Sequence, residues 1–149
     1  MLRLRGATSE VADFTEGRFE PVLDDPTITD PQSVRRVLVH AGKIHYDLTS
    51  EIEKRGTQGV ALVRLEQFFP LPEAELQAVF DRYPNAELVW VQDEPENQGA
   101  WPFFALESAK KPGRGVRVIS RPASASPATG STKRSAQEHA AIMDAALAD

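Results

Sequence analysis

Short apolar runs alternate with segments of helical periodicity along most of the chain. Near-continuous apolar stretches bounded by turn residues predict buried strands, which we place at 37–41, 60–65, 88–91 and 116–119. Apolar residues at helical spacing predict helices between them, at 44–55, 76–83 and 101–110, the first ending at Gly56. This alternation is typical of a mainly parallel sheet covered by helices on both faces.

The C-terminal segment predicts one further helix. Its apolar positions share one helical face: Ile142, Met143, Ala146 and Leu147. Ser135 stands three residues before Glu138, which is the spacing of a capping box. We therefore expect a helix that begins near Ser135 and packs its apolar face on the sheet.

The first 33 residues follow no clear pattern and predict an arm outside the α/β domain. They are polar, they contain Pro21, Pro26 and Pro31, and their apolar residues are scattered. We expect residues 1–33 to form an irregular N-terminal arm that wraps a neighbour, with its aromatic residues as anchors. Residues 34–149 are expected to form one α/β domain with a three-layer α/β/α arrangement.

Composition narrows the possible functions. The net charge of −5 at pH 7 argues against a general nucleic-acid binder, which needs a basic surface. The chain has no cysteine, which excludes disulfides and thiolate metal sites. No apolar run approaches the roughly 20 residues of a membrane span, and no apolar signal segment follows the basic start. We expect a cytoplasmic protein that binds neither nucleic acid nor membrane.

Candidate anion-binding residues lie in the loops that follow the predicted strands. Ligands of such sheets bind beyond the carboxyl ends of the strands. Gly42-Lys43 stands between a strand and a helix, where free N–H groups can hold an anion. No glycine-rich phosphate motif accompanies this pair, so a tight turn with a solvated lysine is the ordinary interpretation. Arg121, at the start of the serine-rich loop 120–131, adds a second cation.

The segment 93–101 carries three carboxylates but no nucleophile or metal-binding partner. It precedes a predicted helix, whose N-terminus favours negative charge. Trp101, Phe103 and Phe104 follow, and exposed together they would form an apolar patch too large for a monomer. We interpret the segment as a helix cap and a protein interface. Its interface candidates are Glu94, Asn97, Gln98 and Trp101.

The histidines and serines form no recognisable catalytic pattern. His40 is expected in a strand and His139 in a helix, without an acidic ligand at metal spacing, so no metal site is expected. No nucleophile-elbow motif surrounds any serine of the loop 120–131. No catalytic or cofactor-binding residue is therefore assigned. A small hydrolase stays a third hypothesis, and it would need a serine, a histidine and a carboxylate within hydrogen-bond reach.

Three segments, 37–46, 63–72 and 90–101, resemble the C-terminal domain of the decarboxylating, thiamine diphosphate-dependent subunit of 2-oxoglutarate dehydrogenase. The loop Glu94-Pro95-Glu96-Asn97-Gln98-Gly99-Ala100-Trp101 is the most specific part of the likeness. The arm, the segment 121–130 and the final helix fit the family as well, so the likeness spans nearly the whole chain. It is greatest to the actinobacterial members, the multifunctional 2-oxoglutarate metabolism enzymes.

The resemblance implies a transketolase C-terminal-like sandwich with a mixed sheet, usually with one antiparallel strand. In the complete oxidoreductase of the citric acid cycle, thiamine diphosphate and Mg²⁺ serve the decarboxylation of 2-oxoglutarate. The succinyl group then passes to a lipoyl arm of the dihydrolipoyl acyltransferase. These cofactors are expected in the preceding domains and not in this segment.

The role that the resemblance implies here is structural. The domain would pack against the thiamine-binding domains of its own subunit and support a homodimer, without catalysis of its own. The family's equivalent of Met1 is an internal residue, so we expect the chain to be part of a longer subunit.

A regulatory site is a second implication of the resemblance. Some actinobacterial members are activated by acetyl-CoA at a site that this domain helps to form, which makes Arg5 and Arg121 candidate ligands, together with Lys43. Pro122 stands where the family has a second arginine. The alternative function is a free-standing acyl-CoA-binding regulatory module, which a basic cleft containing Lys43 and Arg121 would favour.

Overall fold

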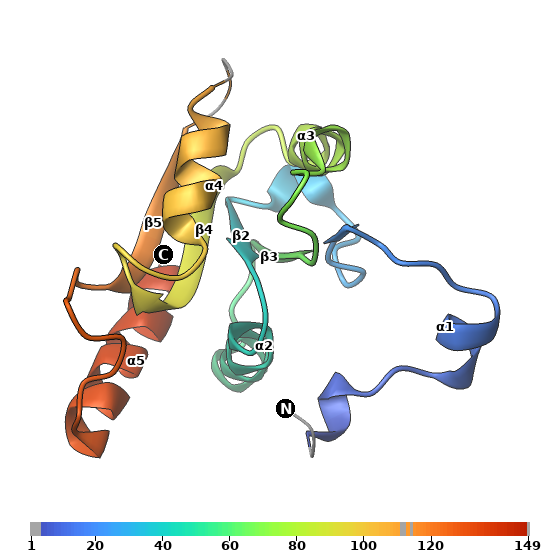
Figure 1. The fold of residues 1–149 in the computed structure, drawn as a ribbon. Helices are drawn as coiled ribbons and strands as arrows, with labels where there is room; N and C mark the ends of the chain where they lie inside the picture. Colours follow the sequence, from blue (N-terminus) through green and yellow to red (C-terminus); the bar gives the residue numbers. More distant parts are fainter. Residues whose placement is uncertain (1–3, 111–112, 114, 149) are drawn as a thin grey trace.

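A mixed sheet between two layers of helices forms the body of the protein (Figure 1). The computed structural model describes residues 4–110, 113 and 115–148, and only the backbone of Arg5. The strands are β1 (Val22–Leu23), β2 (Arg36–His40), β3 (Val60–Leu65), β4 (Glu87–Pro95) and β5 (Val116–Arg121). Their order is β1-β3-β2-β4-β5, with β2 to β5 parallel and β1 antiparallel to β3. The expected three-layer sandwich with a mainly parallel, mixed sheet is confirmed.

Each parallel strand is followed by a helix, as the pattern predicted. The helices are α2 (Ile44–Arg55), α3 (Glu73–Arg82), α4 (Trp101–Ser108) and α5 (Thr132–Leu147). Helix α2 ends at Gly56, whose φ of 65° lies in the left-handed region that glycine adopts without steric cost. No helix among the described residues is long and apolar enough to span a membrane. The sequence also predicts a turn at Lys111-Pro112-Gly113, of which the structure describes only Gly113.

Successive side chains of each strand point to opposite faces of the sheet and form two separate hydrophobic cores. The core under α3 and α4 holds Val37, Val39, Ala61, Val63, Leu65, Leu88, Trp90 and Phe104. The opposite core, under α2 and α5, holds Leu38, Val60, Leu62, Val89, Val91, Ile119 and the apolar side of α5. The same alternation determines which layer of helices a residue near the end of a strand faces.

Two boundaries differ from the sequence-based expectation. Strand β4 continues through Asp93 to Pro95, where a loop was expected, because Pro95 still pairs with Arg121 after an irregularity in the ladder. Helix α5 begins at Thr132 and is capped by Ser131, whose hydroxyl accepts from the Arg134 N–H at 3.4 Å. The capping box of Ser135 and Glu138 was wrong, because both residues already lie inside the helix.

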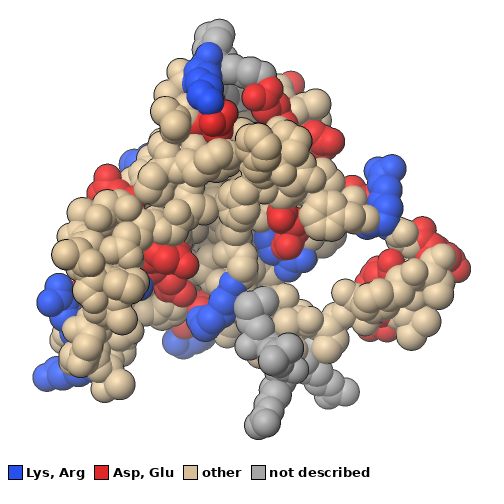
Figure 2. Space-filling model, in the orientation of Figure 1, with Lys and Arg blue, Asp and Glu red and all other residues tan. Residues whose placement is uncertain are grey.

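The arm meets the sheet through residues 21–25, whereas the segment 11–15 stands away from it (Figure 1). It contains β1, the short helix α1 (Val11–Thr15) and two 3-10 turns, Arg5–Ala7 and Pro31–Ser33. Figure 2 shows the α1 segment as a separate lobe with acidic side chains around uncharged surface. Its apolar side chains face solvent, with exposed fractions of 77% for Val11 and 79% for Phe14. The fold thus joins β1 to the sheet, whereas the apolar side chains of α1 stay exposed within the part of the chain that the structure describes.

Candidate functional site

The carboxyl ends of the parallel strands bring polar residues to one edge of the sheet. His40 and Arg121 end strands β2 and β5, and Arg64 and Asp93 lie near the ends of β3 and β4. They continue the alternation of the α2/α5 core, so they face the layer of α2 and α5. This is the edge where ligands of parallel sheets bind, and the chain places four ionisable side chains there.

Lys43 and Arg121 line the same cavity at this edge. The cavity has a volume of about 510 Å³ and is lined by Lys43, Asp93, Arg121, Thr132, Ser135, Ala136 and His139. Lys43 lies in the β2–α2 connection and Arg121 at the end of β5, so the topology joins two residues far apart in sequence. The third anion candidate, Arg5, has a side chain outside the part of the chain that the structure describes.

Carboxylates and carbonyl groups already partner these cations. The Lys43 ammonium pairs with Asp47 and lies 4.0 Å from Asp93 Oδ2. Arg121 Nε donates to the Asp93 carbonyl, and its Nη2 donates to the Pro127 carbonyl at 3.1 Å. An anion that entered the cavity would compete with these contacts. Arg121 therefore also fixes the loop 122–131 to β4.

The same edge holds one histidine and two carboxylates that the sequence spacing did not reveal. Donor atoms of Asp47, Asp93 and His139 lie within 4.8 Å of one another, and His139 Nδ1 is 3.0 Å from Asp93 Oδ1. The three residues come from α2, β4 and α5, so no local motif could indicate them. Because Lys43 pairs with Asp47 within this group, its ammonium compensates the charge that a metal ion would otherwise compensate.

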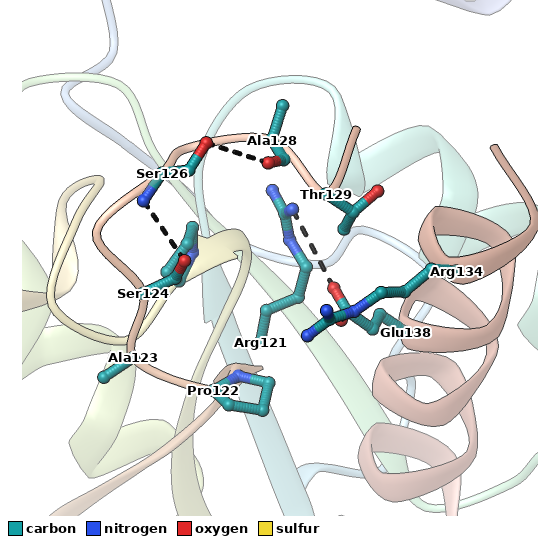
Figure 3. Close-up of a pocket in the computed structure, with 10 residues that line it drawn as sticks. Arg121, Pro122, Ala123, Ser124, Ser126, Ala128, Thr129, Arg134 and Glu138 are labelled. Carbon is teal, nitrogen blue, oxygen red and sulfur yellow. Dashed lines mark hydrogen bonds and ion pairs between the residues drawn. The ribbon is translucent and has the colours of Figure 1, made fainter. Parts of the chain in front are cut away.

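A smaller pocket of about 230 Å³ adjoins the first and shares Arg121 with it (Figure 3). Glu138 stands between two arginines there: Arg134 Nε donates to Glu138 at 2.7 Å, and Arg121 Nη1 is 4.0 Å from Glu138. The serine-rich loop forms the opposite wall, where Ser126 Oγ donates to the Ala128 carbonyl. The loop hydroxyls thus serve the loop itself.

No hydrogen-bonded nucleophile–base–carboxylate chain exists among the described residues. His139 and Asp93 supply a histidine–carboxylate contact, and Ser135 lines the same cavity one helical turn before His139. Ser135 Oγ forms no hydrogen bond with His139 in the part of the chain that the structure describes. The arrangement therefore does not support the hydrolase hypothesis.

A buried glutamine that the sequence reasoning missed organises the segment 93–101. The Gln92 side-chain oxygen accepts from Trp90 Nε1 at 3.0 Å and from the Trp101 backbone N–H at 2.9 Å. Its amide nitrogen donates to the carbonyls of Pro95 and Gln98 at 3.0 and 2.8 Å. The amide of Gln92, and not the carboxylates 93–96, therefore caps the N-terminus of α4.

The interface candidates occupy different environments. Glu94 is exposed, whereas Asn97 and Gln98 bind the next loop, both donating to the Ser124 carbonyl, at 3.0 and 2.8 Å. Trp101 is half-buried and packs near Phe104, whose exposed fraction is 1%. The three aromatic residues 101, 103 and 104 are therefore not exposed together, because α4 turns Phe104 into the core.

Comparison with known proteins identifies the family. A family model described as 2-oxoglutarate dehydrogenase C-terminal matches residues 8–147. The chain is 44% identical to a multifunctional 2-oxoglutarate metabolism enzyme of Mycobacterium sp. (strain JLS), over 99% of the chain and 12% of that protein. The protein of that name from Mycolicibacterium vanbaalenii is also 44% identical, over 99% of the chain and 12% of the relative. The chain thus spans about an eighth of the length of these relatives, and it belongs to the family of 2-oxoglutarate dehydrogenase C-terminal domains.

Proposed function

We propose that the chain is the interface-forming C-terminal domain of a 2-oxoglutarate dehydrogenase subunit and has no catalytic activity of its own. In this role it packs against the preceding thiamine-binding domains and supports a homodimer. The complete subunit would decarboxylate 2-oxoglutarate and pass the succinyl group to a lipoyl arm of the acyltransferase. Its family membership supports the assignment, because the relatives that it matches are 2-oxoglutarate metabolism enzymes about eight times its length.

The proposal assigns the cofactors to the rest of the subunit. Thiamine diphosphate needs a site that holds a diphosphate through Mg²⁺ and surrounds a planar ring. The group of Asp47, Asp93 and His139 does not fit this need, because the Lys43 ammonium already pairs with Asp47. We therefore derive no step of the reaction through residues of this chain.

The observation that carries the interface proposal is the exposure of large apolar side chains on the arm. Phe14 and Phe19 have exposed fractions of 79% and 67%, and Val11 accompanies Phe14 on α1. Aromatic residues are frequent anchors at protein interfaces, and burial of one in a partner's pocket contributes about 2 kcal/mol or more. The arm thus presents exposed aromatic side chains that are available to enter a pocket of a partner.

A reconstitution experiment tests this proposal. A relative truncated before its matching region would be mixed with this chain, and association would be measured by calorimetry and by recovery of 2-oxoglutarate decarboxylation. Phe14→Ser combined with Phe19→Ser should weaken association by about 4 kcal/mol in total, if the effects add. Phe69→Ser is the matched control, since Phe69 is 84% exposed but lies between β3 and α3. Equal affinity of wild type and arm variant, or an equal loss in the control, would count against the role of the arm.

Binding of an acyl-CoA is a second candidate function. It is favoured by one observation, which is that Lys43 and Arg121 line a single cavity of about 510 Å³. The phosphate groups of the ligand would compete with Asp47 for Lys43. Lys43→Gln is the cleaner test, because Arg121 also holds the serine-rich loop in place. Titration calorimetry with acetyl-CoA should show saturable binding to the chain and at least about tenfold weaker binding to this variant. Undiminished binding to the variant would exclude this site.

A further inference from the structure

A second and larger cavity lies between the arm, β3 and α2, and Arg64 of the edge described above also lines it. It has a volume of about 740 Å³, a size typical of small-molecule sites. The arm contributes residues 23–28, α2 contributes His45, Thr49, Ile52 and Glu53, and β3 contributes Val60, Leu62 and Arg64. The connection 57–59 between α2 and β3 completes the lining. Contacts that hold the arm to the sheet therefore also build the cavity.

Arg64 is the one cation among the residues that line this cavity. Its buried Nε lies 2.6 Å from Glu66 Oε1 and forms an ion pair with it. Its Nη groups form no hydrogen bond within the described part of the chain, and 25% of the side-chain surface is exposed. A carboxylate in the cavity would accept charge-assisted hydrogen bonds from these groups.

His45 presents an acceptor to the same cavity, which follows from a chain of hydrogen bonds. His40 is fully buried, and its Nδ1 must donate to the Leu38 carbonyl at 2.9 Å. Burial lowers the pKa of His40 to about 3, so its ring is neutral and its Nε2 accepts. His45 Nδ1, at 2.9 Å from that Nε2, is therefore the donor. Burial also lowers the pKa of His45, so its own Nε2 carries a lone pair, with no partner in the described part of the chain.

The remaining walls are acidic and apolar. Asp24 pairs with Arg82, whereas Asp25 and Glu53 have no cationic partner among the described residues, and this acidic lining disfavours a ligand with only negative charge. Leu23, Ile28 and Ile52 supply aliphatic surface. A ligand that fits this cavity carries a hydrogen-bond acceptor for Arg64 and a positively charged donor for His45 and the acidic wall. It also carries a short aliphatic group for the apolar wall.

We propose that this cavity binds a zwitterionic α-amino acid with an aliphatic side chain. The carboxylate accepts from Arg64, the ammonium donates to His45 Nε2, and the side chain lies against Leu23, Ile28 and Ile52. The proposal is independent of the interface role of the domain, because it involves neither the exposed side chains of α1 nor the cavity of Lys43 and Arg121.

The test uses the wild-type chain and three matched probes. L-Leucine carries both charged groups, 4-methylpentanoate lacks the ammonium, and 3-methylbutylamine lacks the carboxylate. Binding would be followed by NMR through the ring nitrogens of His45 and the amide of Leu62. L-Leucine should saturate one site below about 10 mM, and each incomplete analogue should bind at least about tenfold more weakly.

Variants then locate the site. Arg64→Gln should lose at least about tenfold in affinity for L-leucine but not for 3-methylbutylamine, which lacks the carboxylate. Arg117→Gln is the control, since Arg117 is an exposed arginine on β5 and should leave leucine binding unchanged. The proposal is overturned if L-leucine moves no signal of His45, or if 4-methylpentanoate binds as tightly as L-leucine. Because the probe series needs only the wild-type chain, a variant that fails to fold does not affect this decision.

Discussion

The side chain of Gln92 accepts a 2.9 Å hydrogen bond from the backbone N–H of Trp101 and so joins the end of β4 to the start of α4. The same side chain also satisfies the indole N–H of Trp90 in the core. One amide therefore holds the conformation of the whole intervening segment.

Replacing this amide should destabilise the protein strongly. Gln92→Leu leaves at least the N–H groups of Trp90 and Trp101 without an acceptor, at a cost of about 3 kcal/mol or more in the free energy of unfolding. Urea denaturation monitored by tryptophan fluorescence measures this change. Gln77→Leu is the control, because Gln77 is exposed on α3 and bonds only Asp81, so its effect should stay within about 0.5 kcal/mol. Similar midpoints for the two variants would contradict the role of Gln92.

Asp25 should be the main attachment of the arm to the sheet. Its carboxylate accepts from the backbone N–H of Leu62 at 2.9 Å and from that of Thr27 at 2.9 Å, although β1 itself has ended. Asp25→Ala should lower the free energy of unfolding by about 2 kcal/mol and speed hydrogen exchange at Leu62. Asp144→Ala removes an exposed carboxylate on α5 and is expected to change neither quantity measurably. Unchanged exchange at Leu62 in Asp25→Ala would show that the other contacts of the arm, β1 among them, hold it without Asp25.

His40 should make the folded state sensitive to moderate acid. Its pKa is lowered to about 3 in the fold, against about 6.5 in the unfolded chain, so between these values only the unfolded state binds the proton. Stability therefore falls as the pH drops below about 6.5, by about 2 kcal/mol at pH 5 from this residue. His40→Asn retains a donor for the Leu38 carbonyl and does not titrate. Urea midpoints at pH 7 and pH 5 should differ less in this variant than in wild type, and an equal difference would contradict the assignment.

Arg36 is expected to anchor the end of α5. Its Nη1 donates to the carbonyls of Ala146 and Ala148 at 3.0 and 2.9 Å, while its Nε binds Glu87. Hydrogen bonds from Arg117, and a further one from Arg36, hold the pKa of Glu87 below its usual value. Arg36→Met should lower the free energy of unfolding by about 1–2 kcal/mol and increase hydrogen exchange in the last turn of α5.

Arg117→Met provides the comparison for Arg36. The substitution removes the second arginine that binds Glu87. The Arg117 side chain is 48% exposed and forms no hydrogen bond with a carbonyl of α5 in the described part of the chain. Its effect should stay below about 0.5–1 kcal/mol. If both variants cost the same, the contact with α5 contributes nothing beyond the ion pair.

The local pattern predicted the elements whose apolar residues lie close together in sequence. Strands β2 and β3 were predicted nearly to the residue, because both are buried on two faces. The two residues of β1 carry no such pattern, since their strand conformation comes from pairing with Arg64 and Leu65. The end of β4 was missed because Asp93 and Glu94 are polar, and only the ladder to β5 holds them extended.

The candidate site likewise has one part that the sequence predicted and another part that it did not. The topology of parallel strands predicts that Lys43 and Arg121 lie at the same edge of the sheet. The two side chains do line one cavity there. The contact of His139 with Asp93 depends on how α5 lies across the sheet, and the sequence alone contains no distance between them. Gln92 was missed because a single glutamine has no motif, and its importance comes only from its burial.

The way in which the arm meets β3 also bears on aggregation. An open strand edge is a template on which another chain can add a strand. Here β1 and the Asp25 carboxylate cover the outer edge of β3, and the Pro21 carbonyl accepts from the N–H groups of Glu66 and Gln67 directly after the strand. Loss of the arm through proteolysis or truncation would therefore expose a strand of Val-Ala-Leu-Val-Arg-Leu to solvent, the kind of apolar edge from which fibrils grow.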